Sequence, residues 1–211
     1  MKAASVIIGY DPGGNGCHGI ARLLVRGGKA TGVETMALAT TEEVICFIEE
    51  QESLVALGVD TLSCWYTGRS SWRPADLWLR ERYPAVRNSV VNANALFGSM
   101  GLNGMAVLLS ARRSHPDALI TETHPKVLYH EMTGRKYDYA GCSEAMDDAL
   151  AGALGVAISP GNDHEWDAGL SAFAALEAFT GRWTNDLLQL PHGAGERRVS
   201  PCARTHYYWP K

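Results

Sequence analysis

The sequence predicts an α/β domain in which helices pack on one sheet. Three observations support this class: apolar runs near the N-terminus are separated by glycine-rich turns, later apolar runs end on an acidic residue, and two strongly helical segments follow. With 211 residues, 46% of them hydrophobic and 20% charged, the chain is expected to form a single domain with one buried core. We expect the core to span about residues 1–183 and a loop-rich tail to span 184–211.

The first third of the chain predicts an antiparallel meander. A strand that includes Val6–Ile8 ends at Asp11, where a Pro-Gly-Gly turn breaks it. Further strands are expected at Ile20–Val25 and Val33–Leu38, joined by the turn RGGKATG. Thr40 or Thr41 then caps a helix with two glutamates in its first turn.

The rest of the chain alternates strands and helices. SLVALGVDTL predicts a strand with Asp60 near its end, and ALITETHP predicts a short strand that ends at Glu122. Between them, PADLWLRERYP predicts a short helix, VRNSVVNAN fits either a strand or a loop, and the three glycines of ALFGSMGLNGMAVLLSARR favour a broken helix. SEAMDDALAGALGVAI and DHEWDAGLSAFAALEAF predict two helices separated by Ser159–Gly161.

Charge and cysteine content exclude several classes of protein. The net charge of -4 gives no overall attraction to nucleic acid or to anionic membranes, so a polyanion would need a local patch. The five cysteines form no C-x-x-C pair, which indicates reduced thiols in a cytoplasmic protein. No segment approaches the roughly 18 apolar residues of a membrane span, and the N-terminal apolar run is too short for a signal peptide.

The glycines after Asp11 allow three interpretations. Gly14, Gly16 and Gly19 match the dinucleotide-binding pattern G-x-G-x-x-G, but only a strand-length segment follows before the next turn, which leaves no room for the crossover helix of that fold. The alternative is a carboxylate at a strand end, unless Asp11 only organises its own turn. The other acidic residues favour the carboxylate.

Four acidic residues are expected at one edge of the sheet. Asp11, Asp60 and Glu122 each end a predicted strand, and Asp167 lies near the start of the last helix. Like charges this close are costly without a cation, and oxygen ligands without His or Cys select Mg²⁺ or Mn²⁺. Two such ions support phosphodiester cleavage.

Other charged residues are weaker candidates. Asp163 is expected to serve the helix start, where Asn162 and Glu165 resemble a capping box, while Asp147 and Asp148 form a rival acidic pair. His124 and His130 do not have zinc-ligand spacing. Several arginines lie among aromatic residues, a pattern that suits phosphate contacts and base stacking but also an amphipathic surface helix: Arg69, Arg73, Arg80, Arg82 and Arg87, with Trp65, Tyr66, Trp72 and Trp78. The final segment RTHYYWPK either packs on the domain or mediates association.

Four segments follow the Asp11 strand and its glycine-rich hairpin in a distinctive order: VDTLSCW, WRPADLWLRERYP, ETHPKVLYHEMTG and HEWDAGLSAFAALEAFTGRW. This order resembles the ribonuclease-H-like family catalogued as domain of unknown function 429, up to about Trp183. The resemblance implies a mixed five-stranded sheet with helices packed on it, and a metal-dependent nuclease activity that is itself predicted for the family. By matching position, Asp11 is the first-strand metal ligand, Asp60 and Glu122 are the later strand-end acids, and Asp167 is the helix acid.

The leading hypothesis is a phosphodiester hydrolase in which Asp11, Glu122 and Asp167 hold Mg²⁺ or Mn²⁺ and Asp60 supports them. Arg69 and Arg73 are the expected substrate-binding residues, with nucleic acid or a nucleotide as the partner. One alternative is a non-catalytic module on the same fold that binds a nucleotide or a protein. Another is a nucleotide phosphoryl-transfer domain of the actin-like kind, for which a homodimer would supply the usual second domain.

Overall fold

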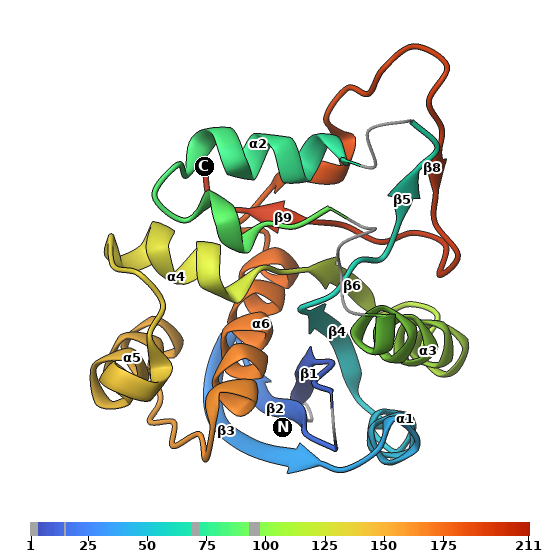
Figure 1. Ribbon diagram of the computed structural model, residues 1–211. Helices are drawn as coiled ribbons and strands as arrows, with labels where there is room; N and C mark the ends of the chain where they lie inside the picture. The colour runs from blue at the N-terminus through green and yellow to red at the C-terminus, as the bar shows by residue number, and fades with distance from the viewer. Residues whose placement is uncertain (1–3, 15, 69–71, 93–97) are drawn as a thin grey trace.

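A mixed five-stranded sheet forms the centre of the molecule in the computed structural model, which describes residues 4–14, 16–68, 72–92 and 98–211. The strand order is β3-β2-β1-β4-β6 (Figure 1). The first three strands form the antiparallel meander, while β1, β4 and β6 are parallel, as expected. The strands are β1 (Ser5–Asp11), β2 (His18–Arg26), β3 (Lys29–Leu38), β4 (Leu54–Val59) and β6 (Leu119–Glu122).

Helices cover both faces of this sheet. On one face, α1 (Thr41–Glu49) and α3 (Gly98–Ser114) pack against side chains such as Ile8 and Leu57. On the other face, α6 (Asp163–Phe179) crosses the strands, and α4 (Pro125–Thr133) and α5 (Tyr139–Leu154) lie outside it (Figure 1). Because successive side chains of a strand point to opposite faces, the apolar residues of β1 and β4 contribute to two separate hydrophobic cores.

Local sequence signals explain the ends of several helices, but two helices differ from what the sequence predicts. Thr40 caps α1 in a capping box with Glu43, and the Asn162 side chain caps α6 by accepting from the Glu165 amide. The break expected in α3 does not occur within Gly98–Ser114; residues 95–97 of that segment lie outside the described residues. The helix α4 was not expected, although Pro125 begins it and Gly134 ends it in a left-handed conformation.

Three glycines allow α6 to lie directly on the sheet. A Cβ atom at Gly9, Gly19 or Gly58 would overlap a backbone carbonyl of α6, from Ala168, His164 and Ser171 respectively. Gly19 stands opposite Asp11 in the β1–β2 hairpin, so its function is close packing rather than phosphate binding. The helix start is thereby held beside the end of β1.

The C-terminal tail packs back on the domain. The backbone of His206 donates to Ile120 and accepts from Glu122, so the tail covers the open edge of β6. Tyr207 and Trp209 are buried, and the Trp209 indole donates to the Tyr83 hydroxyl at 2.8 Å. No helix in the described ranges is both long enough and apolar enough to cross a membrane.

Short elements complete the upper part of the molecule in Figure 1. The predicted helix at PADLWLRERYP is α2 (Pro74–Arg82), and the stretch after it contains a 3-10 turn at Arg87–Ser89. Two-residue strands join the tail to the rest of the chain in two small sheets: β5 (Trp65–Tyr66) with β8 (Arg198–Val199), and β7 (Asn185–Asp186) with β9 (Tyr208–Trp209).

Candidate active site

Three aspartates meet where β1 and β4 end. Asp11 is the last residue of β1, and Asp60 directly follows β4, with its amide donating to the Tyr10 carbonyl at 2.9 Å. Asp167 lies one turn into α6, which the packing glycines hold against the same strands. Asp11 and Asp167 are buried and Asp60 is half-buried. The cluster thus joins two strands and a helix that are far apart in the sequence.

Burial and mutual repulsion disfavour the charged forms of Asp60 and Asp167. Burial and then repulsion from Asp11 raise the pKa of Asp60 well above its usual value. Burial, then Asp60 and Asp11, do the same to the pKa of Asp167. Lys126, an exposed residue of α4, acts in the opposite direction on both carboxyl groups but more weakly. A cation added near these carboxylates would relieve this repulsion.

One carboxylate oxygen in the cluster has no hydrogen bond of ordinary geometry. Asp167 Oδ1 and the Tyr137 hydroxyl are both buried, and neither makes a hydrogen bond of ordinary geometry among the described residues. The two side chains still interact, because Tyr137 lowers the pKa of Asp167, although less than burial and the other two aspartates raise it. A buried carboxylate oxygen normally accepts at least one hydrogen bond or binds a cation. Asp167 is therefore chemically suited to bind a hard cation such as Mg²⁺ or Mn²⁺.

The arrangement is not a closed set of metal ligands. Within the described parts of the chain, no group of three or more His, Cys, Asp or Glu side chains is placed so that it could hold an ion together. The type of donor thus fits Mg²⁺ or Mn²⁺, while a complete set of three ligands is not preformed.

His164 is a site residue that sequence analysis missed. Its Nδ1 atom lies 2.6 Å from Asp11 Oδ2, and this hydrogen bond, more than the charge of Asp11, raises the pKa of His164. His164 precedes Asp167 by three residues on α6, a spacing that places both on one face of the helix. That spacing was the available signal. The adjacent Asp163 is exposed in the first turn, as its expected role at the helix start requires.

Glu122 belongs to a different group of side chains from the three aspartates. It pairs in register with Val59, whose side chain packs toward α1 and α3. Because successive residues of a strand point to opposite faces, Glu122 is on the face of Val59 and not on that of Asp60. Thr123 has the orientation of Asp60 instead, and its hydroxyl lies 2.6 Å from that of Ser171 on α6. The Glu122 carboxylate accepts from the amide and hydroxyl of Ser63 at 2.7 and 2.6 Å.

Arg73 completes the surroundings of Glu122 and is not available to grip a phosphate. Its side chain is buried, donates to Glu122 at 2.8 Å and forms two bonds with the Asp76 carboxylate at 2.8 and 2.9 Å. The expected substrate-binding role of Arg73 conflicts with this burial, because two carboxylates already occupy its guanidinium group. The second expected arginine, Arg69, lies outside the described residues.

The remaining sequence candidates have ordinary structural partners. Arg80 lies over the Trp72 ring at 4.7 Å and donates to two backbone carbonyls, which suits a surface helix. Asp147 accepts from the Tyr139 hydroxyl at 3.3 Å, and Asp148 is exposed on α5. The two histidines contact separate backbone carbonyls rather than a shared ion: His124 that of Ser89 and His130 that of Arg135.

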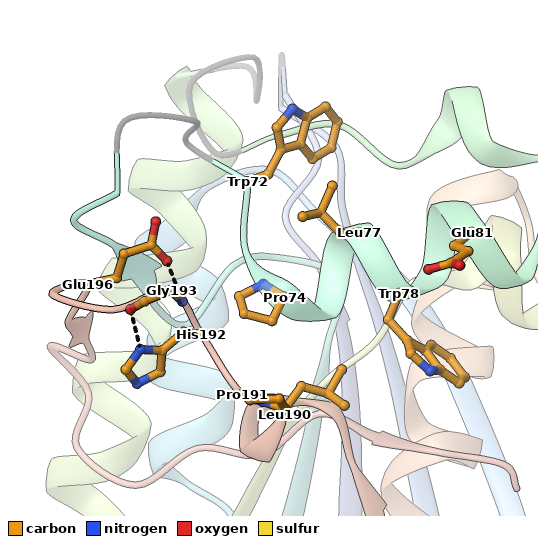
Figure 2. A pocket seen from close by; sticks show the side chains of 10 residues that line it. All are labelled: Trp72, Pro74, Leu77, Trp78, Glu81, Leu190, Pro191, His192, Gly193 and Glu196. Atoms are coloured by element: carbon orange, nitrogen blue, oxygen red, sulfur yellow. Dashed lines mark hydrogen bonds between the residues drawn. The ribbon is translucent and has the colours of Figure 1, made fainter.

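Two hollows lie near these elements. A cavity of about 240 Å³ adjoins Asp60 and reaches His124 and Lys126. A wider groove of about 410 Å³ lies between α2 and the tail, where Trp72, Pro74, Trp78 and Pro191 face it (Figure 2). None of the three clustered aspartates lines this groove, whereas Asp60 lines the smaller cavity.

Comparisons with known proteins support the fold. No family model matches the chain, and no curated protein matches it either, so the family resemblance noted from the sequence is not confirmed. Among solved structures, RuvC of Thermus thermophilus matches with a TM-score of 0.50 and 17% identity, covering 83% of this chain and 96% of that chain. At this identity the likeness concerns the fold alone. Together with the sheet order, it shows that this chain has the ribonuclease-H-like fold of RuvC.

Proposed function

We propose that this protein is a metal-dependent phosphodiester hydrolase that acts on a nucleic acid. The observation that carries the proposal is the cluster of Asp11, Asp60 and Asp167, in which burial and mutual repulsion raise the pKa values of Asp60 and Asp167. The ribonuclease-H-like fold supports it, because the family that the sequence resembles has this fold and is itself predicted to consist of metal-dependent nucleases.

The proposed ligand set differs from the sequence-based hypothesis in one residue. Asp60 replaces Glu122, because Arg73 and Ser63 already satisfy the Glu122 carboxylate. Asp11, Asp60 and Asp167 would hold Mg²⁺ or Mn²⁺, which when bound supplies Lewis acidity and an activated water. Because no three-ligand set is preformed, small side-chain movements of these residues would accompany binding.

The remaining residues of the site have roles that follow from their contacts. Asp11 holds Nδ1 of His164, which leaves the other ring nitrogen of this half-buried residue to exchange a proton with substrate or water. Lys126 carries a positive charge that lowers the pKa of both Asp60 and Asp167, and we assign it to a phosphate group of the substrate. The overall negative charge of the chain makes such a local cation necessary.

Cleavage of labelled single-stranded and duplex DNA and RNA, with Mg²⁺ or Mn²⁺ present, tests the proposal. We expect cleavage by the native protein, its loss in EDTA, and its loss in Asp11→Asn and Asp167→Asn. Asp148→Asn, the same change at an exposed site on α5, should retain full activity. Inactivity on every substrate, or full activity of Asp11→Asn, would contradict the proposal.

A second candidate is a non-catalytic module on the same fold. The observation in its favour is that the described carboxylates and histidines form no ready set of three metal ligands. Calorimetric titration with Mn²⁺ distinguishes the two candidates. Binding that disappears in Asp167→Asn favours the hydrolase, and no binding at millimolar Mn²⁺ favours the non-catalytic module.

A further inference from the structure

The cavity beside Asp60 has the features of a ligand site. Its volume of about 240 Å³ is smaller than the roughly 300–1,000 Å³ of sites for drug-sized molecules, which suits a single small ring system. Leu62, Val90 and Met100 are among its apolar lining residues, and Tyr207 from the tail adds an aromatic ring. The ion-paired side chains of Arg73, Asp76 and Glu122 also line it. Asp60 and Lys126 line the same cavity, so its contents would lie next to the proposed site of cleavage.

Two residues that line the cavity each have a buried polar atom with no hydrogen-bond partner among the described residues. His124 Nε2 lies 3.1 Å from the Ser89 carbonyl oxygen, and because a carbonyl only accepts, Nε2 carries the proton. Nδ1 of the neutral ring is therefore an acceptor, and it is buried without a partner among the described residues. The hydroxyl of Thr61, a residue only 5% exposed, is also buried without a hydrogen-bond partner among the described residues.

Unpaired buried polar atoms are unusual in folded proteins, and two of them in one cavity indicate a missing partner. A partner that serves both must present an N–H donor to His124 Nδ1 and a polar edge to the Thr61 hydroxyl, while its flat faces contact apolar walls. A nucleobase has this combination: ring or exocyclic N–H groups at its edge, and apolar faces above and below.

We propose that this cavity binds one nucleobase of the substrate, unstacked from its strand, next to the phosphodiester bond that is cut. The inference rests on the proposed function. The base would enter between the apolar lining residues, and its own phosphate would then lie near Lys126 and Asp60, which line the same cavity. An enzyme that binds an unstacked base must open its substrate locally. Single-stranded regions are therefore the preferred substrate class.

Fluorescence of 2-aminopurine tests this proposal without requiring turnover. The catalytically impaired Asp11→Asn protein is mixed with single-stranded DNA that carries one 2-aminopurine, and binding is followed separately by anisotropy of a terminal dye. We expect the 2-aminopurine signal to rise on binding, because the base leaves its stacked neighbours. Binding without any such rise would overturn the base pocket and leave the hydrolase standing, whereas no binding to any nucleic acid would count against the proposed function itself.

Two conservative variants in the same background locate the effect. His124→Gln keeps a donor toward Ser89 but removes the Nδ1 acceptor, and Thr61→Val removes the hydroxyl with little change of shape. Each should weaken binding roughly tenfold, the size expected for one buried hydrogen bond, and should reduce the 2-aminopurine signal. His130→Gln, the same change on α4 outside the cavity, should have no effect.

An oligonucleotide with one abasic site provides a measurement that does not depend on how well a variant folds. The native protein should bind it more weakly than the intact strand, because the base that the cavity would hold is missing. Equal binding of both strands by the native protein would overturn the proposal.

Discussion

Nδ1 of His164 lies 2.6 Å from Oδ2 of Asp11, and this contact joins the first turn of α6 to the end of β1. The two residues are 153 positions apart in the sequence. They meet because Gly19, opposite Asp11, lets the backbone of His164 approach the hairpin. The close packing of a helix on glycines therefore assembles the chemical groups of the site.

The bond between His164 and Asp11 predicts a pKa of His164 above its usual 6.5. Asp11→Asn should lower this pKa, because it removes the charged acceptor. Titration of the imidazole protons by NMR in metal-free protein measures the change, with Asp148→Asn as the control. Since the folded-state pKa is raised, the pair stabilises the protein below pH 6.5, and this contribution is lost as the pH rises through the raised pKa. An unaltered His164 titration in Asp11→Asn would show that the contact is absent in solution.

Neutralising one carboxylate of the cluster should stabilise the metal-free protein. The raised pKa values of Asp60 and Asp167 mean that their contribution to the free energy of unfolding is largest below pH 3.8, the ordinary value, and falls as the pH rises through the raised values. At pH 7.5 in EDTA, Asp167→Asn should therefore increase the free energy of unfolding, because it removes a charge that burial and the other two aspartates disfavour. Thermal denaturation measures this.

Added Mn²⁺ supplies the matched comparison for Asp167→Asn. It should raise the melting temperature of the native protein and leave that of the variant nearly unchanged, because ligand binding to the folded state is stabilising. A variant that melts below the native protein in EDTA would contradict the mutual repulsion inferred for the cluster.

The glycines under α6 should tolerate no side chain. Gly9→Ala and Gly58→Ala each place a Cβ into a backbone carbonyl of the helix, so we expect a loss of at least about 1–3 kcal/mol in the free energy of unfolding. Gly152→Ala is the control, because no atom lies within 4 Å of a Cβ at this position on α5; alanine should there be neutral or stabilise by up to ~1 kcal/mol. Denaturant unfolding distinguishes these outcomes, and equal stability of Gly9→Ala and the native protein would contradict the close packing.

Arg73 should act on stability rather than on substrate affinity. Arg73→Met leaves Glu122 and Asp76 without their buried partner and should destabilise the protein by about 3–5 kcal/mol. Arg26→Met, at an exposed position, should change the stability by less than ~0.5 kcal/mol. A stable Arg73→Met protein with weakened nucleic-acid binding would instead support the role that the sequence suggested.

The sequence by itself determined the elements whose causes are local. Turn residues set the ends of β1 and the meander, Thr40 and Asn162 begin their helices through their own side chains, and Asp11 and Asp60 are recognisable as acids at strand ends. These features depend on residues within a few positions of one another, so they can be read along the chain.

Only the tertiary structure decided which acids meet. The register of β6 against β4 turns Glu122 toward Arg73 and Ser63, and a shift by a single residue would reverse its face. The burial of Arg73, the contact of His164 with Asp11 and the return of the tail to the edge of β6 likewise join distant segments. Such pairings depend on packing between elements rather than on neighbouring residues, and a single sequence does not contain the distances that choose among them.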